Sequence, residues 1–222
     1  MITNGSDIKK LQEREWTISK ELERLVSPDE SALIRKVEEY SKENLKSISH
    51  GFDHTQRVYN LAYHIGRWEG ADLLIVLTAA LLHDLGRVIE EGIGADHAET
   101  SAYYAKDILK SINFPREKMK GVFTAIKQHR ARHGDAPSTL EAKVLSDADN
   151  LDALGAIGIG RTFTYGGNIK RDVRGTVRFI QDHMLNRSER MYTQTAQRMS
   201  EKRIAYMIKF LQRIEEEVHG IK

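Results

Sequence analysis

Residues 71–86 read ADLLIVLTAALLHDLG, and this stretch decides the fold of the 222-residue chain. The part before the HD doublet is almost continuously apolar, which is the pattern of a helix buried on all sides. We expect Gly86 to end this helix as a C-cap. The doublet His83-Asp84 follows the apolar run directly. Two chemically active side chains are therefore expected at the end of the most buried segment.

Helical periodicity extends through most of the remaining sequence. Apolar residues recur at the i, i+3, i+4 and i+7 spacing of amphipathic helices. Helices are expected after Asp53, over His97–Ser111, Glu117–His129 and Leu140–Leu154, and along the apolar stripe from Ile204 to Val218. Few segments alternate with period two, and three prolines leave room for long helices. We therefore predict an all-α helical bundle.

The glycine-rich stretch Gly155–Gly175 is the least regular part of the sequence. Its glycine spacing does not match a dinucleotide-binding fingerprint, and no strand–turn–helix unit frames it. We interpret it as close helix packing followed by a flexible loop through residues 165–167.

No repeat, low-complexity tract or Pro/Gly/Ser-rich linker divides the chain. We therefore predict one domain over residues 1–222, with a core motif region at about residues 50–165. Additional terminal helices are expected over residues 6–49 and 176–219. These helices could pack on the core or on a second subunit, so a homodimer is one assembly that the sequence permits.

Composition excludes several classes of protein. The chain has no Cys, so disulfides, zinc ribbons and thiolate chemistry are ruled out. Its net charge of +2 is too small to argue for nucleic-acid binding. No apolar run approaches the length of about 18 residues that a membrane span needs. The N-terminus lacks an apolar secretory core, so we expect a cytoplasmic protein without membrane association.

Positive charge is nevertheless concentrated between Arg161 and Arg213. This segment carries twelve Lys or Arg residues against four Asp or Glu residues. One interpretation is a solvated helix face, and the other is attraction of an anionic substrate. Nucleic acid is the weaker partner here, because aromatic side chains that stack on bases are sparse in the segment.

Imidazole and carboxyl groups stand where the apolar pattern calls for core residues. His54 lies four residues before Val58, and Asp149 lies four residues after Leu145. Asp is almost never fully buried unless it is paired or bound to a metal. A single His on an apolar face is more often a satisfied core residue. With the His83-Asp84 doublet, however, the simplest common partner is a divalent cation held by nitrogen and oxygen ligands.

Three sequence blocks carry these residues. They are DHTQRV at 53–58, ALLHDLG at 80–86 and DADNLDALG at 147–155. In this order they resemble the H…HD…D signature of the HD superfamily of metal-dependent phosphohydrolases, over about residues 50–165. The amino-acid sequences of the blocks are most similar to those of the small stand-alone bacterial and archaeal members.

The resemblance implies an all-helical HD-domain fold and a metal site. One divalent ion would be held by the four signature residues His54, His83, Asp84 and Asp149, and Asp84 would also take part in catalysis. Hydroxide would attack phosphorus at this metal, so no protein nucleophile is needed. The ligand types are compatible with manganese, iron, cobalt, nickel or zinc and, less naturally, magnesium.

Further residues complete the predicted site. His97 and His129 stand near positions where some branches of the superfamily place additional His residues. A second metal, a phosphate contact and proton donation are all left open for them. Asp152, three residues after Asp149, is a candidate general acid or water-orienting group. Some branches place a catalytic acid where this chain has Arg87, so that role is not transferred. Candidates for binding substrate phosphate are Arg57, Arg87, Lys127 and Arg161.

The expected function is hydrolysis of a small phosphorylated metabolite, with a nucleotide first among the substrates. Pyrophosphohydrolase and phosphomonoesterase reactions both fit this expectation. The alternatives are a phosphodiesterase and a non-catalytic module that senses a nucleotide or a metal.

Overall fold

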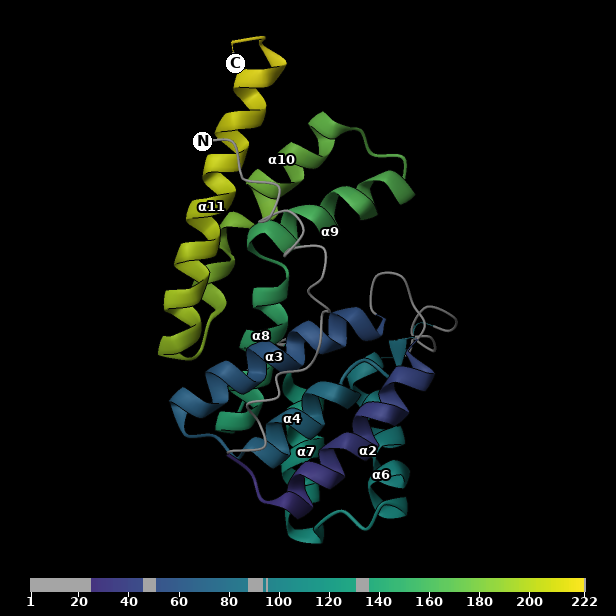
Figure 1. The fold of residues 1–222 in the computed structure, drawn as a ribbon. Helices are drawn as coiled ribbons and strands as arrows, with labels where there is room; N and C mark the ends of the chain where they lie inside the picture. The colour runs from purple at the N-terminus through teal and green to yellow at the C-terminus, as the bar shows by residue number, and fades with distance from the viewer. Residues whose placement is uncertain (1–24, 46–50, 88–93, 95, 131–135, 222) are drawn as a thin grey trace, which may run out of the picture.

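Every regular element that the computed structural model describes is a helix, so the all-α prediction is confirmed. The described residues are 25–45, 51–87, 94, 96–130 and 136–221. The helices are α2 (Pro28–Asn44), α3 (Phe52–Glu69), α4 (Leu73–Leu82), α6 (His97–Ser111), α7 (Arg116–Gln128), α8 (Leu140–Asp152), α9 (Gly155–Asn168), α10 (Val173–His183), a 3₁₀ helix (Leu185–Arg190) and α11 (Gln194–Val218) (Figure 1). Of the helix predicted over residues 6–49, α2 is the described part, and residues 6–24 and 46–49 lie outside the described residues.

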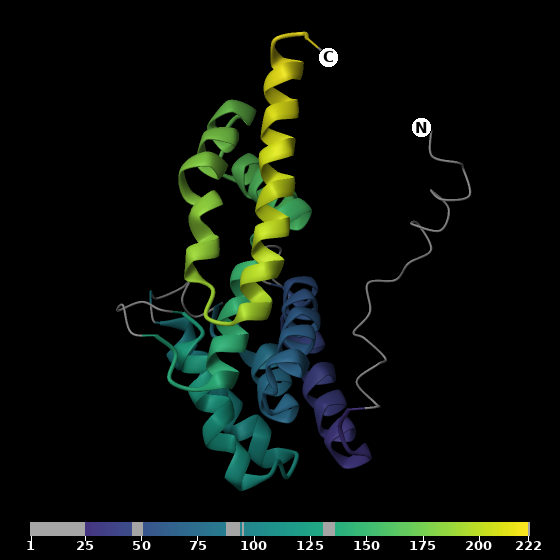
Figure 2. The ribbon, with the colours of Figure 1, turned by 90° about the vertical axis from the view of Figure 1, so that its left-hand side faces the viewer.

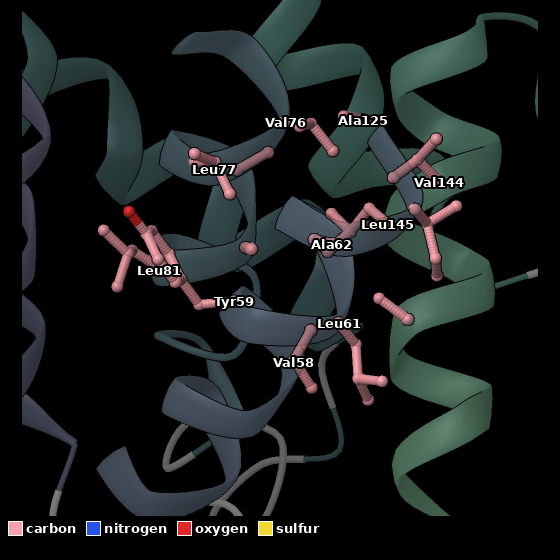
Figure 3. Packing of buried hydrophobic residues seen from close by; sticks show 14 of the residues in the cluster. Val58, Tyr59, Leu61, Ala62, Val76, Leu77, Leu81, Ala125, Val144 and Leu145 are labelled. Carbon is pink, nitrogen blue, oxygen red and sulfur yellow. The ribbon is translucent and has the colours of Figure 1, made fainter. Parts of the chain in front are cut away.

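Helix α4 is the buried centre of the bundle that α2, α3, α4, α6, α7 and α8 form, which we call the lower bundle (Figure 1). It contacts α2, α3, α6, α7 and α8, and its residues from Val76 to Leu82 are all fully buried. Figure 3 shows Leu77 and Leu81 of α4 close to apolar side chains of α3 such as Tyr59. Asp72 starts the helix by accepting a hydrogen bond from the backbone N–H of Ile75. The prediction of a helix buried on all sides is confirmed.

The predicted glycine C-cap at Gly86 is wrong. Helix α4 ends at His83 in right-handed helical conformation, and Gly86 does not have a positive φ. Gly86 instead lies against the first turn of α6, where its N–H donates to Ser101 Oγ at 2.8 Å. A Cβ on Gly86 would lie 2.6 Å from the carbonyl oxygen of His97. The missing side chain therefore allows the turn after His83-Asp84 to approach α6 closely.

The predicted flexible loop at residues 165–167 is also wrong, because α9 continues through Asn168. Helix α10 packs against this part of α9. At Gly166, an added Cβ would lie 2.6 Å from Thr176 Oγ1 of α10. Glycine is needed here for the close approach of two helices, which is the other half of the interpretation made from the sequence.

The C-terminal segment is divided rather than continuous over residues 176–219. The 3₁₀ helix and residues 191–193 separate α10 from α11. The buried carboxylate of Asp147 on α8 holds this break. It accepts hydrogen bonds from the backbone N–H groups of Tyr192 and Thr193, both at 2.8 Å, and from Thr193 Oγ1 at 2.7 Å. Thr193 then caps α11 through its side chain.

Helices α9, α10 and α11 stand on one side of the lower bundle (Figures 1 and 2). Helix α11 contacts α3 and α8 as well as α9, so it joins the two parts. That residues 1–222 form one domain stays a prediction. None of the helices in the described ranges is both long and apolar enough to cross a bilayer.

Replacement of Gly86 tests the close approach between the doublet and α6. We expect Gly86→Ala to lower the free energy of unfolding by about 2 kcal/mol, since overpacked sites typically cost about 1–3 kcal/mol. The control is Gly160→Ala in α9, where no atom lies within 4 Å of an added Cβ. There alanine should stabilise by up to about 1 kcal/mol through its helix propensity. Urea unfolding measures both, and equal effects would contradict the packing role of Gly86.

Candidate metal centre

The structure brings the four predicted metal ligands together from three helices. His54 lies on α3, His83 and Asp84 lie at the end of α4, and Asp149 lies on α8. His54 Nε2 is 3.5 Å from Asp84 Oδ2 and 3.4 Å from Asp149 Oδ1. His83 Nε2 is also 3.5 Å from Asp84 Oδ2. The side chain of Asp149 is 24% exposed, whereas the other three are at most 1% exposed, so Asp149 marks the open side of the cluster.

Several atoms of this cluster that could ligate a metal have no hydrogen-bond partner among the described residues. His83 Nε2, Asp84 Oδ2 and His129 Nε2 are buried and have no hydrogen-bond partner among the described residues. Buried polar atoms are normally paired, so these atoms indicate a missing partner. The ligand separations near 3.5 Å suit atoms that each lie about 2.1 Å from one ion. Two groups fit a cation, His54–His83–Asp149 and His83–Asp84–His129, each with ligand atoms within 4.8 Å of one another.

Hydrogen bonds at the far side of two imidazole rings set their tautomers. His83 Nδ1 and His129 Nδ1 lie 2.8 Å and 2.6 Å from the backbone carbonyl oxygens three residues earlier in the chain. A carbonyl oxygen only accepts, so each Nδ1 carries the hydrogen. Each Nε2 therefore presents a lone pair to the cluster, as metal ligation requires.

His97 has the opposite arrangement. Its Nδ1 lies 3.1 Å from Nη1 of Arg130. A guanidinium only donates, so His97 Nδ1 accepts and its Nε2 carries the hydrogen. Burial and the nearby charge of Arg87 lower the pKa of His97 to about 4, which keeps the ring neutral at pH 7. His97 Nε2 lies 3.5 Å from Asp84 Oδ1. This arrangement favours hydrogen-bond donation over metal ligation.

Asp152 lies behind His54 rather than in front of it. Its Oδ2 is 2.7 Å from His54 Nδ1, and its carboxylate also accepts from Nε and Nη2 of Arg57 at 2.7 Å and 3.1 Å. Burial alone would raise the pKa of Asp152, but the hydrogen bonds from His54 and Arg57 lower it to about 2. A carboxyl group this acidic holds no proton to donate near neutral pH. The geometry favours a role in positioning His54.

The four predicted phosphate-binding cations differ in their positions. Arg57, Arg87 and Arg161 line the cavity beside the cluster, but each also pairs with a carboxylate. Arg87 Nε donates to Asp84 Oδ1 at 3.0 Å, which leaves Asp84 Oδ2 for the cluster. Lys127 does not join them. Its Nζ lies 2.6 Å from Glu99 Oε2 at a half-exposed position outside the cavity lining, which corrects the expectation for this residue.

A cavity of about 1210 Å³ opens from the cluster of predicted metal ligands between α8, α9 and the 3₁₀ helix. This volume is ample for a small-molecule ligand. Among the described residues that line it, arginines outnumber acidic residues. The lining arginines are Arg57, Arg87, Arg130, Arg161, Arg171, Arg187 and Arg190, and the lining acidic residues are Asp53, Asp149 and Glu189.

Four of these arginines, namely Arg130, Arg171, Arg187 and Arg190, were not singled out in the sequence. The excess of positive charge between residues 161 and 213 is the signal that covers three of them. It could not separate them from cations such as Arg174, which is exposed and does not line the cavity. The basic segment therefore contains both exposed cations and cations that line the cavity, and attraction of an anionic substrate stays a prediction for the second group.

The HD domain family matches residues 51–154, which include the first two sequence blocks and all of the third except Gly155. The chain belongs to the HD family. It is 33% identical to YpgQ of Bacillus subtilis over 184 residues, covering 79% of this chain and 88% of YpgQ. HD-superfamily hydrolases are generally metal-dependent phosphohydrolases, which agrees with the donor set of the cluster.

Solved structures support the same assignment. The crystal structure of B. subtilis YpgQ in complex with ADP superposes with a TM-score of 0.73 at 30% identity, over 87% of this chain and 98% of that one. A predicted HD superfamily hydrolase from an uncultured Thermotogales bacterium has a TM-score of 0.64 at 34% identity, over 84% and 91% of the two chains. The HD fold thus extends well beyond the three blocks.

Metal affinity should distinguish the two kinds of histidine. We expect His83→Ala to reduce Mn²⁺ affinity by more than the roughly 10- to 100-fold loss typical of removing an outer partner. His97→Gln should bind Mn²⁺ nearly as well as the unmodified protein, because His97 presents an N–H. Titration calorimetry measures both. Equal losses in the two variants would contradict the tautomer derived for His97.

Metal binding should also release a proton from His54. Burial disfavours its imidazolium form, but the carboxylates of Asp149 and Asp152 outweigh burial and raise the pKa of His54 to about 9. At pH 7 the metal-free ring is therefore protonated and must lose its proton to bind an ion. We expect release of about one proton per ion at pH 7, declining as pH rises through about 9. Calorimetry in buffers of different ionisation enthalpy measures it, and zero release at pH 7 would contradict the charge of His54.

Proposed function

We propose that this protein is a metal-dependent phosphohydrolase whose substrate is a small phosphorylated metabolite, first of all a nucleotide. The observation that carries the proposal is the convergence of His54, His83, Asp84 and Asp149 at one end of an arginine-lined cavity. The structural similarity to a relative solved with ADP supports a nucleotide as the ligand.

These four residues would hold the divalent cation. When bound, the cation supplies activation of water and neutralises charge that develops on phosphorus. We propose manganese first, with iron, cobalt, nickel, zinc and magnesium as the alternatives. His129 has a lone pair facing the cluster, so a second ion would use His129 together with His83 and Asp84.

The remaining side chains orient the ligands and bind the phosphate. Asp152 fixes the ring of His54, and Arg87 fixes the carboxylate of Asp84. His97 offers a neutral N–H within the cluster, which suits contact with a phosphate oxygen or donation to the leaving group. Arg57 and Arg161 reach the cavity while neutralising Asp152, so we propose that they stabilise the substrate's charge over a short distance.

A product analysis tests this proposal. The protein is incubated with Mn²⁺ and a panel of nucleoside mono-, di- and triphosphates, and the products are separated by chromatography. We expect metal-dependent cleavage of a P–O bond. Release of pyrophosphate or of orthophosphate decides between the pyrophosphohydrolase and phosphomonoesterase reactions. A phosphodiester included in the panel tests the third reaction. Tight ADP binding with no turnover on any substrate would favour the sensor alternative.

Substitutions at the site should separate metal loss from positioning. We expect Asp84→Asn to abolish turnover together with metal binding. Asp152→Asn should retain metal while kcat/KM falls by about 10- to 100-fold, the typical loss for an outer partner of a metal ligand. Lys127→Gln is the matched control outside the cavity and should leave kcat/KM unchanged. Full activity in Asp152→Asn would contradict the positioning role.

A further inference from the structure

The 3₁₀ helix Leu185–Arg190 contributes two cations, Arg187 and Arg190, to the cavity that contains Asp149. Arg187 is partly buried, and its Nε is inaccessible to solvent and has no hydrogen-bond partner in the part of the chain that the structure describes. Within the same part of the chain, no carboxylate forms an ion pair with it. A buried guanidinium without a counter-ion is costly, because burial of a charge is normally compensated by pairing.

The surroundings of Arg187 connect it to the metal cluster. Burial and the charges of Arg190 and Arg161 lower the pKa of Arg187, whereas the nearby carboxylate of Asp149 raises it. Arg187 therefore lies within electrostatic reach of a predicted metal ligand and of two other cations. Since arginine stays charged in proteins, Arg187 and Arg190 keep positive charges with which no described carboxylate forms an ion pair.

Three other cavity arginines differ from Arg187 in having internal hydrogen-bond partners. Arg171 does not differ in this way, because its Nε and Nη2 also have no hydrogen-bond partner among the described residues, although its guanidinium lies 4.3 Å from the centre of the Phe179 ring. Arg57 and Arg161 pair with Asp152, and Arg130 contacts His97. Arg187 thus retains its donors for a ligand. A guanidinium presents a planar fork that matches two oxygens of one phosphate.

We propose that Arg187, with Arg190 beside it, binds a second phosphate group of the substrate, next to the phosphate that reaches the metal ligands. The inference rests on the proposed function and narrows its substrate class to compounds with two or more linked phosphates. A monophosphate can occupy the metal cluster alone, whereas a diphosphate can occupy both positions.

Binding of AMP and ADP to Arg187→Gln tests the proposal, and the measurement with a chelator excludes metal-dependent turnover. Calorimetry is done with Mn²⁺ and again with a chelator. We expect the Kd for ADP to rise by about tenfold or more, the scale of one hydrogen bond to a charged group, in both conditions. The Kd for AMP should change by less than about twofold, since AMP would not use this position. Arg187→Lys should recover part of the ADP affinity, because it keeps the charge but not the fork.

Arg174→Gln on α10 is the matched control, because Arg174 is exposed and does not line the cavity. It should bind both nucleotides like the unmodified protein. Unchanged ADP binding in Arg187→Gln would overturn the proposal, as would equal losses for AMP and ADP. If thermal unfolding shows that Arg187→Gln does not fold, Arg187→Lys is used instead. A lower ADP-to-AMP affinity ratio in Arg187→Lys than in the unmodified protein would support the proposal, and an unchanged ratio would overturn it.

The outcomes for the proposed function are separate. A protein that hydrolyses nucleotides but binds ADP normally after Arg187→Gln keeps the hydrolase function and loses the second phosphate position. A protein that hydrolyses nothing but loses selective ADP binding in this variant keeps the position and loses the hydrolase function.

Discussion

The hydrogen bond between His54 Nδ1 and Asp152 Oδ2, 2.7 Å long, is the interaction on which the rest of the site depends. It joins α3 to α8, and both side chains are 1% exposed. Neither group could be buried there alone, because removing one partner of a buried pair leaves an uncompensated charge that costs about 3–5 kcal/mol. The pair fixes how α3 lies on α8, and it turns His54 Nε2 toward the other predicted ligands.

The other ligands follow the same rule, each held from behind by a different group. The carboxylate of Asp84 is held by Arg87, and His83 and His129 are held by carbonyl oxygens of the preceding turn. The protein's own hydrogen bonds therefore orient the predicted ligands, as in preorganised metal sites. Gly86 contributes to this arrangement without contacting the predicted ion, because its missing side chain lets the turn after His83-Asp84 approach α6 and His97.

The sequence was sufficient for the helices around α4 and for the four candidate ligands, since both depend on local patterns. Polar residues that interrupt an apolar stripe are visible without a structure. The hydrogen-bond partners that a side chain finds on another helix cannot be seen in the sequence. Spacing alone indicates a substrate contact for Arg57, three residues after His54, and a general-acid or water-orienting role for Asp152, three residues after Asp149. In the structure these two side chains bind each other.

The cations of the 3₁₀ helix are a second case in which the position of a side chain depends on contacts between helices that the sequence does not show. Arg187 and Arg190 reach the cavity only because the C-terminal segment is interrupted after them, and that break is held by Asp147 on α8. An unbroken helix would place residues of this segment by its own periodicity, with no relation to α8. The carboxylate that anchors the break lies two residues before Asp149, so one turn of α8 positions both a predicted metal ligand and the cations that face it.

Charge balance then indicates what the cavity is built to hold. Asp84 and Asp149 carry two negative charges, which would match the two charges of the divalent ion that we propose they hold. Arg171, Arg187 and Arg190 are left over from this balance, and none of them forms an ion pair with a described carboxylate. A neutral ligand would leave the positive charge of Arg187 uncompensated. Arg187 is partly buried, so solvent screens its charge less than that of the exposed Arg190. Electrostatic complementarity therefore favours a ligand that carries negative charge near Arg187 as well as at the predicted metal ligands.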